Sequence, residues 1–258
     1  MKVPNPLMDE FFRFGLSKIP VIIATTNHVK IARLTIFLNH IAKNLPIEFV
    51  CYTLDDLGIK DDNCPEIYYT FEGNSNLKND YFYYMIREHV ESFKEKSFLL
   101  VTNDAGLSIP VLENWPNVHT KRCWMNYPPE ENITTSAQAI IHEASKLDPT
   151  HRFGYFTCAT TVSICRNTYL SKGITRYVPA PLSRDVLTME SSQMVKIVTD
   201  VPLEEQKTAW DVCAPLVNQN EECNRTYRHL TYFQLVNYGD PMYKSLESVM
   251  NRFLGEDE

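Results

Sequence analysis

Glycine is scarce in this chain, which has only 8 glycines among its 258 residues, about half of the usual share of ~7%. Neither G-x-G-x-x-G nor G-x-x-x-x-G-K-[ST] occurs, so the glycine-rich phosphate loops of dinucleotide-binding and P-loop proteins are excluded. The G-x-S-x-G turn of many serine hydrolases is missing as well. Any phosphate group that the protein binds must therefore be held by other chemical groups.

The cysteines and histidines form none of the common metal or disulfide patterns. The chain has seven cysteines, an odd number, and no two of them are spaced as C-x-x-C. No two of the seven histidines are spaced as H-x-x-x-H or H-E-x-x-H. Such spacings would mark a zinc ribbon or a zinc hydrolase. We therefore expect free thiols in a reducing compartment rather than a disulfide or zinc framework.

Long apolar runs and an excess of positive charge are absent too. No stretch approaches the ~20 apolar residues that cross a bilayer. Acidic residues and prolines interrupt residues 1–15, where a secretion signal would be apolar. The 32 acidic residues outnumber the 25 basic ones and give a net charge of −7. The sequence thus predicts a cytoplasmic protein with no membrane and no nucleic-acid partner.

Apolar runs of strand length alternate with segments of helical periodicity along the chain. A β-branched apolar run predicts a strand over residues 19–24, and the spacing of apolar residues predicts a helix directly after it. Further strands are expected at 47–54, 98–102, 153–165 (with 169–178 as hairpin partner) and 194–201, and further helices at 74–96, 134–147 and 242–254. This pattern predicts an α/β fold with a mixed sheet, in a single domain spanning residues 1–258.

Three polar segments follow apolar strands or open helices, where α/β proteins usually bind ligands. The first is A-T-T-N-H-V-K at residues 24–30, between the first strand and the first helix. A helix N-terminus attracts phosphate through its backbone N–H groups and its dipole, and Lys30 lies one turn into the helix. The simpler alternative is that Thr25 or Asn27 only caps the helix and that Lys30 is solvated.

The other two segments contain carboxylates. E-I-Y-Y-T-F-E-G-N-S-N-L-K at residues 66–78 runs from an extended acidic stretch into a helix that contains Lys78. N-D-A-G-L at residues 103–107 places Asp104 at the predicted end of a buried strand. A strand-end aspartate is a common Mg²⁺ ligand or general base, and a carboxylate beside a lysine suits a metal–phosphate site. The alternatives are a solvated loop with a helix cap for the first segment and a turn-capping aspartate for the second.

Together the three segments resemble the inosine triphosphate pyrophosphatase family, which cleaves non-standard purine nucleoside triphosphates. The motifs of that family read A-T-x-N-x-x-K, E-x-x-x-T-F-x-x-N-A-x-x-K-A, D-D-S-G-L and P-G-x-x-S-A-R. The first three correspond to the segments that begin at Ala24, Glu66 and Asn103. The segment P-N-V-H-T-K-R at residues 116–122 is a looser counterpart of the fourth. All four occur in the order that the family shows.

The resemblance implies a mixed, elongated β-sheet flanked by helices, with two lobes and a central nucleotide-binding cleft. It also implies Mg²⁺-dependent cleavage of ITP, dITP or XTP to the monophosphate and pyrophosphate. By position, Glu66 and Asp104 would be the catalytic carboxylates that hold Mg²⁺ and orient or deprotonate the attacking water. The same motifs imply a set of substrate-binding residues: Thr25, Asn27, Lys30, Asn74, Lys78 and Arg122.

The sequence departs from the family at several positions. Asn103 and Ala105 replace the first aspartate and the serine of D-D-S-G-L, and the lost charge at Asn103 predicts weaker metal binding or a weaker base. The base-recognition loop G-F-G-Y-D-P has a remnant in Trp210 and Asp211, where Trp210 would stack on a purine and Asp211 would accept a hydrogen bond. The later S-H-R motif, which helps to read the base in the family, is missing.

These features leave two classes of function open. The retained carboxylates and lysines favour a pyrophosphatase. The departures favour a weakened nucleotide sensor that recognises a dITP-like ligand and regulates an effector protein, a role that would suit anti-phage defence. The expected partners are a purine nucleoside triphosphate and either a second copy in a homodimer or an effector protein. A third interpretation is a plain α/β protein in which the segments serve only as caps and turns.

Overall fold

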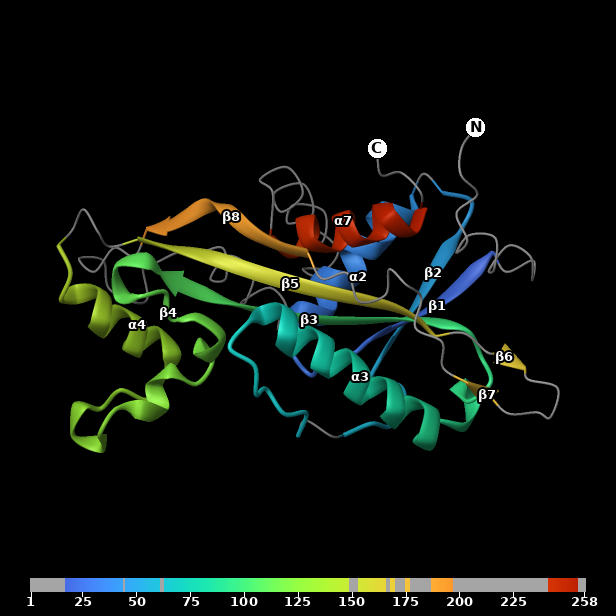
Figure 1. Cartoon of the computed structure of the whole chain (residues 1–258), viewed down its shortest axis with the longest axis horizontal. Coiled ribbons are helices and arrows are strands. Elements are labelled where there is room, and N and C mark those ends of the chain that lie inside the picture. Colours follow the sequence, from blue (N-terminus) through green and yellow to red (C-terminus); the bar gives the residue numbers. More distant parts are fainter. Residues whose placement is uncertain are drawn as a thin grey trace, which may run out of the picture.

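The computed structural model of this chain shows an elongated molecule built on one main sheet (Figure 1). The structure describes residues 17–43, 45–60, 63–148, 153–165, 168–169, 175–176, 187–196 and 241–254.

The main sheet is mixed, as predicted. Strand β1 (Lys18–Ile23) pairs in parallel with β2 (Glu48–Thr53) on one side and with β3 (Phe98–Ile109) on the other. Strand β3 in turn pairs antiparallel with β5 (Phe153–Cys165), and β5 pairs antiparallel with β8 (Leu187–Lys196). The strand order is therefore β2-β1-β3-β5-β8, with a parallel half and an antiparallel half that meet at β3.

Helices cover both faces of this sheet. Helices α2 (His28–Ala42) and α7 (Pro241–Leu254) lie on one face, and α3 (Phe71–His89) lies on the other (Figure 1). The strands supply both faces because successive side chains point in opposite directions. The α/β class, the mixed sheet and the flanking helices expected from the sequence are thus confirmed.

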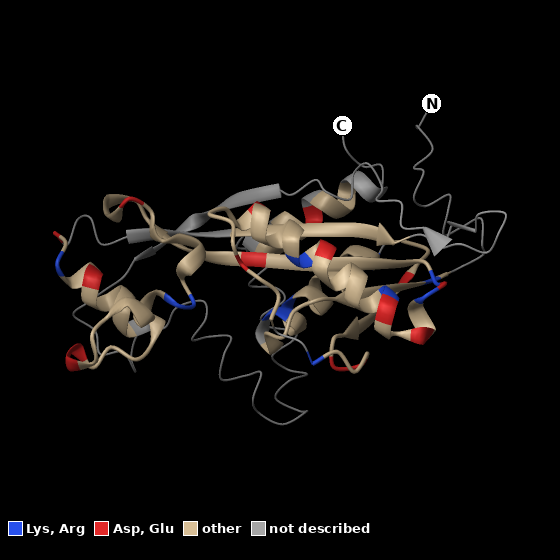
Figure 2. Ribbon diagram, turned by 60° about the horizontal axis from the view of Figure 1, so that its bottom comes forward, with Lys and Arg blue, Asp and Glu red and all other residues tan. Residues whose placement is uncertain are grey.

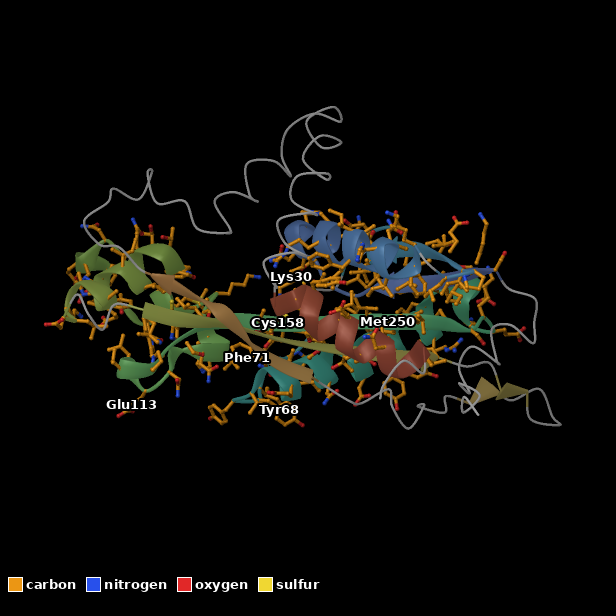
Figure 3. All side chains as sticks on the ribbon, turned by 90° about the horizontal axis from the view of Figure 1, so that it is seen from above. Lys30, Tyr68, Phe71, Glu113, Cys158 and Met250 are labelled. Carbon is orange, nitrogen blue, oxygen red and sulfur yellow. The ribbon has the colours of Figure 1, made fainter. Side chains whose placement is uncertain are left out.

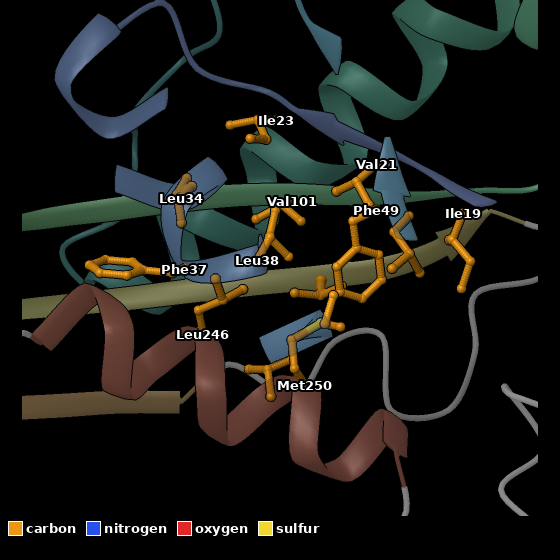
Figure 4. Packing of buried hydrophobic residues seen from close by; sticks show 14 of the residues in the cluster. Ile19, Val21, Ile23, Leu34, Phe37, Leu38, Phe49, Val101, Leu246 and Met250 are labelled. Atoms are coloured by element: carbon orange, nitrogen blue, oxygen red, sulfur yellow. The ribbon is translucent and has the colours of Figure 1, made fainter. Parts of the chain in front are cut away.

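The core between the sheet and helices α2 and α7 is closely packed (Figure 4). In β1, Val21 faces this core, whereas the next residue, Ile22, faces α3. Burial of the apolar side of α2 also holds its N-terminal segment against the end of β1. The core includes Ile19, Val21, Ile23, Leu34, Phe37, Leu38, Leu99, Val101, Leu246 and Met250.

Strands β3 and β5 continue past these helices into a second lobe (Figure 1). Strand β4 (Trp115–Pro116) pairs antiparallel with the end of β3 there. Helix α4 (Ser136–Ser145) lies in the same lobe, where Leu107, Ile109 and Ala144 form a small core of their own. Short 3₁₀ helices connect these elements: η2 (Pro110–Leu112), η3 (Asn117–His119), η4 (Cys123–Asn126) and η5 (Pro129–Glu131).

Strand β3 is longer than the strand predicted at residues 98–102, so Asp104 does not lie at a strand end. The prediction was wrong because pairing with a distant segment sets the length of this strand. Every residue of β3 from Phe98 to Ser108 has a partner in β5. The polar residues Asn103 and Asp104 are therefore held in regular extended backbone rather than in a turn.

Helix α3 differs from the predicted helix at residues 74–96 at both ends. It begins at Phe71, because Thr70 Oγ1 accepts a hydrogen bond from Gly73 N at 3.1 Å and caps the helix. It ends at His89, and a short 3₁₀ helix, η1 (Glu91–Phe93), follows. The Arg87 guanidinium donates to carbonyl groups in and after this turn, which stabilises the break in the helix.

Two expectations for the C-terminal half were wrong. Strand β6 (Thr168–Tyr169) pairs with β7 (Thr175–Arg176) and not with β5. The second edge of β5 pairs instead with β8, which begins at Leu187. The strand predicted at residues 194–201 overlaps only the end of β8, and residues 197–201 lie outside the described part of the chain.

A buried polar network attaches α3 to the middle of the sheet. Ser75 Oγ lies 2.9 Å from Thr161 Oγ1, and Thr102 Oγ1 donates to the Ser75 carbonyl at 2.8 Å. Asn79 Nδ2 donates to Thr102 Oγ1 at 3.3 Å, and Ser163 Oγ donates to Asn79 Oδ1. Each of these five side chains is at most 2% exposed. Because hydrogen bonds are directional, this network restricts sliding of α3 along its axis more strictly than apolar contact would.

The second lobe approaches β3 closely at Gly106. A Cβ atom on Gly106 would lie 2.5 Å from the Asn117 carbonyl oxygen and 2.5 Å from Thr120 Oγ1. Thr120 Oγ1 accepts from Leu107 N at 2.9 Å and donates to the Asn117 carbonyl at 2.6 Å. Only glycine fits this contact, which fixes the segment that leads to Arg122.

In the view of Figure 2, Lys and Arg lie among Asp and Glu along the described elements. Within the described part of the chain, no helix is both long and apolar enough to cross a bilayer.

We expect the change Gly106→Ala to destabilise the fold by about 2 kcal/mol, because the new methyl group overlaps backbone of the second lobe. Chemical denaturation monitored by circular dichroism measures this free energy of unfolding. Gly58→Asn is the matched control: no atom lies within 4 Å of an added Cβ there, and asparagine tolerates the φ of 69°. Equal losses in the two variants would contradict the close contact at Gly106.

We expect Asn79→Leu to cost about 2–3 kcal/mol of unfolding free energy, because it leaves the buried hydroxyls of Thr102 and Ser163 without their amide partner. The double change Asn79→Leu with Ser163→Ala should recover part of this loss, since it removes both members of one hydrogen bond. Glu88→Ala, on the exposed side of α3, is the control and should lie within about 0.5 kcal/mol of the parent. An Asn79→Leu effect no larger than the control would show that the network adds nothing.

Candidate functional site

The site forms where β3 loses its neighbour β1. The last residue of β1 that pairs with β3 is Ile23, opposite Val101. Strand β4 pairs with the same edge of β3, but only from Ser108 onward. No described strand pairs with this edge over residues 102–107, and Asp104 lies in the middle of that stretch. Side chains from helices and loops therefore reach β3 here without a strand in between.

Three of the predicted residues meet at this opening. Lys78 Nζ lies 2.8 Å from Asp104 Oδ1 and 2.6 Å from Glu66 Oε1. The three side chains come from the segment before α3, from α3 itself and from β3. They are only 14% (Lys78), 24% (Glu66) and 10% (Asp104) exposed. One ammonium group thus neutralises two carboxylates in a largely buried place, as the spacing in the sequence suggested.

The charges around Lys78 and Glu66 shift the pKa values of these two groups. Burial alone would lower the pKa of Lys78, but the carboxylates of Asp104 and Glu66 outweigh burial and raise it. Burial likewise opposes ionisation of Glu66, but Lys78 and then Arg122 hold the pKa of Glu66 below its ordinary value. Both groups are therefore charged near neutral pH.

Arg122 brings a second positive charge to Glu66 from the other lobe. Its Nη2 atom forms an ion pair with Glu66 Oε2, the oxygen that does not face Lys78. Arg122 is more exposed than Lys78, with 44% of its side chain accessible. Its place depends on the close contact at Gly106, which fixes the preceding segment. Arg122, predicted as a substrate-binding residue, therefore lies at the same site as Glu66.

Lys30 approaches the site from the other side of the sheet. It lies at the start of α2, on the opposite side of the long strands from Tyr68 and Phe71 (Figure 3). Its Nζ atom donates to the backbone carbonyl of Asn103 at 3.4 Å. Burial, and then the positive charge of Lys78, lower the pKa of Lys30. The two lysines are thus close enough to affect each other electrostatically.

Thr25 and Asn27 occupy the turn before α2, and the predicted capping role is present. Asn27 Oδ1 accepts a hydrogen bond from Lys30 N at 3.2 Å, and Thr25 Oγ1 accepts one from Asn27 N at 3.3 Å. The cap and the predicted phosphate contact are compatible, because the cap orients the positive end of the helix toward the opening beside Lys30.

Asn74 holds the segment that contains Glu66. It is 1% exposed. Its Oδ1 accepts from Tyr68 N at 3.0 Å, and its Nδ2 donates to the Tyr68 carbonyl at 3.1 Å. The structure thus places this predicted substrate ligand one layer behind the site, where it positions the backbone beside Glu66.

Asn103 and Asp104 point to opposite faces of the sheet, as neighbours in a strand must. Asn103 Nδ2 donates to the Ala159 carbonyl at 3.1 Å and to Thr160 Oγ1 at 3.0 Å, both in β5. Asp104 faces α3 and Lys78. The aspartate-to-asparagine departure at position 103 therefore leaves the Glu66–Asp104 pair intact. The weaker metal binding or weaker base expected from the lost charge stays a prediction.

Sequence reasoning missed the polar network behind Lys78. The available signal was the pair Ser75 and Asn79, two small polar residues four positions apart on the side of α3 that also contains Phe82 and Ile86. That side is buried against the sheet. Two other predicted residues, Trp210 and Asp211, lie outside the described part of the chain.

The two carboxylates suit a magnesium ion that is shared with phosphate. Glu66 and Asp104 converge on one Nζ atom, so their oxygens face a common space. No group of three or more His, Cys, Asp or Glu side chains gathers among the described residues. Mg²⁺ is usually held by one or two carboxylates, water and substrate phosphates. The residues present thus fit a metal that arrives with a phosphate ligand better than a metal enclosed by protein alone.

The sequence matches the Ham1 family over residues 21–176. No curated protein matches the chain significantly. Two similar solved structures have low scores. The nucleoside-triphosphatase/dITP/XTP pyrophosphatase from Mycobacterium abscessus aligns with a TM-score of 0.42 and 16% identity over 67% of this chain and 71% of that one. A HAM1 protein from Coxiella burnetii aligns with a TM-score of 0.42 and 18% identity over 85% and 97%. Since the family match spans more than half of the 258 residues, the chain belongs to the Ham1 family, as its resemblance to the inosine triphosphate pyrophosphatases predicted.

Proposed function

We propose that the protein binds non-standard purine nucleoside triphosphates such as dITP, ITP and XTP together with Mg²⁺, and cleaves them to the monophosphate and pyrophosphate. The observation that supports this function is the buried cluster of Glu66, Lys78 and Asp104 in a chain of the Ham1 family. Lys30 at the N-terminus of α2 adds a second ammonium group beside it. Two carboxylates and two lysines at one opening of a sheet suit a metal–triphosphate ligand.

The positive groups of the site bind and orient the triphosphate. Lys30 and Lys78 donate to phosphate oxygens, and the N-terminus of α2 adds its dipole. Arg122 is the third cation and reaches the site from the second lobe. Because these groups come from separate elements that are fixed by packing, they hold the scissile phosphoanhydride in one orientation.

The carboxylates act on metal and water. Glu66 and Asp104 would hold Mg²⁺, which when bound neutralises phosphate charge and lowers the pKa of a coordinated water. Asp104 accepts a proton from the attacking water. The water oxygen bonds to the α-phosphorus, the bond from the α-phosphorus to the bridging oxygen breaks, and pyrophosphate leaves.

Purified protein incubated with Mg²⁺ and dITP, ITP or XTP should release pyrophosphate faster than with the standard triphosphates. Asp104→Asn and Glu66→Gln should each lower the rate by about 10²-fold or more, because they remove the base and a metal ligand. Glu88→Gln, with a side chain that is 69% exposed, is the control and should keep the parent rate. Binding of dITP without release of pyrophosphate would instead favour a nucleotide sensor that acts on an effector protein. No turnover and no binding would rule out both functions.

Lys30→Ala and Lys78→Ala should each weaken binding of dITP much more than binding of deoxyinosine, by about tenfold or more, because they remove contacts to phosphate only. Titration calorimetry in EDTA measures this effect without interference from metal. Lys18→Ala, in an exposed ion pair with Glu48, is the matched control. Equal losses for dITP and deoxyinosine would mean that the two lysines do not face the phosphates.

A further inference from the structure

We propose that Lys78 acts as an internal counter-ion that keeps a divalent metal out of the ligand-free site and yields its place when a triphosphate binds. The inference rests on the proposed function. It adds that metal and triphosphate bind to the site together, because neither ligand alone forms the complete site.

The Lys78 ammonium group occupies the place that a divalent ion would need. Lys78 Nζ lies 2.6 Å from an oxygen of Glu66 and 2.8 Å from an oxygen of Asp104. A divalent ion shared by these two carboxylates would need the space between them. An ammonium group and a metal ion cannot both occupy that space, so metal binding requires Lys78 to move.

The balance of charge also disfavours metal alone. Two negative groups, Glu66 and Asp104, are already paired with two positive ones, Lys78 and Arg122. A free divalent cation thus meets carboxylates whose charge is already neutralised, and it must compete with these two cations for them.

A triphosphate reverses this balance. Its oxygens accept hydrogen bonds from Lys78, whose flexible stem lets the ammonium group move while the buried polar network holds the α3 backbone. Glu66 and Asp104 are mostly buried, so leaving them without a counter-ion would be costly. A divalent ion that binds after Lys78 has moved neutralises these two carboxylates. Triphosphate and metal therefore strengthen each other's binding, and by linkage the effect is reciprocal.

The metal part of the test uses Mn²⁺ alone, followed by loss of the aqueous Mn²⁺ signal in electron paramagnetic resonance. The parent protein should bind Mn²⁺ weakly, and Lys78→Met should bind it about tenfold more tightly or better, because both carboxylates lose their counter-ion. Lys30→Met removes a nearby charge that does not touch either carboxylate, and it should give a much smaller gain. Lys18→Met, in the exposed pair with Glu48, should give none.

The anion part of the test uses inorganic triphosphate in EDTA, followed by titration calorimetry. Lys78→Met should weaken binding. Glu66→Gln and Asp104→Asn should each tighten binding several-fold, because each removes a negative charge and releases Lys78 toward the anion. The same two variants should bind Mn²⁺ more weakly than the parent. Opposite effects on metal and anion distinguish the exchange of partners from a loss of folding, which would weaken both.

An unchanged Mn²⁺ affinity in Lys78→Met, or an equal gain in Lys30→Met, would overturn the inference. A weaker affinity for inorganic triphosphate in Glu66→Gln would overturn it independently, even if Lys78→Met failed to fold. The proposed function is tested separately. If the parent cleaves dITP with Mg²⁺ but Lys78→Met gains no Mn²⁺ affinity, only the inference fails. If Lys78→Met gains affinity but the parent binds no purine triphosphate, the proposed function fails and the counter-ion role stands.

Discussion

The early end of β1 is the constraint on which the rest of the site depends. Strand β1 leaves β3 after Ile23, and the chain turns at once into α2, whose packing against the sheet holds Lys30 at the gap. The other edge of β3 stays paired with β5 through the same stretch, so Asp104 is presented from rigid backbone. A sheet that is open on one edge and closed on the other gives both access for a ligand and fixed positions for the groups that meet it.

The contacts between α3 and the sheet both stabilise the fold and fix the position of Lys78. Apolar contacts near Phe82 and Ile86 supply burial, but they are not directional. The network around Asn79 lies next to Lys78 in the sequence and bonds to both central strands. These directional bonds hold the backbone of α3 in one position along β3, the strand that contains Asp104. Polar contacts in the core therefore set the geometry of the site as well as adding to stability.

The sequence allowed the segments of the site to be predicted, but not the way in which they are held. Glu66, Lys78 and Asp104 were identified by motif order, and the structure brings them together. The strand prediction stopped too early because the continuation of β3 depends on pairing with β5, a partner distant in sequence. The role of Asn74 as a clamp on Tyr68 was missed for the same reason, since a motif records a residue type and not its partner.

The alternation of side chains along β3 divides one short motif into two independent parts. Position 104 faces α3 and Lys78, whereas position 103 forms a hydrogen bond from β3 to β5. Substitutions at these neighbouring positions therefore have different meanings when active and inactive members of the family are told apart. A change at position 103 alters a contact between two strands, whereas a change at position 104 alters the partner of Lys78. A comparison that scores both positions as a single acidic pair would merge these two different contacts.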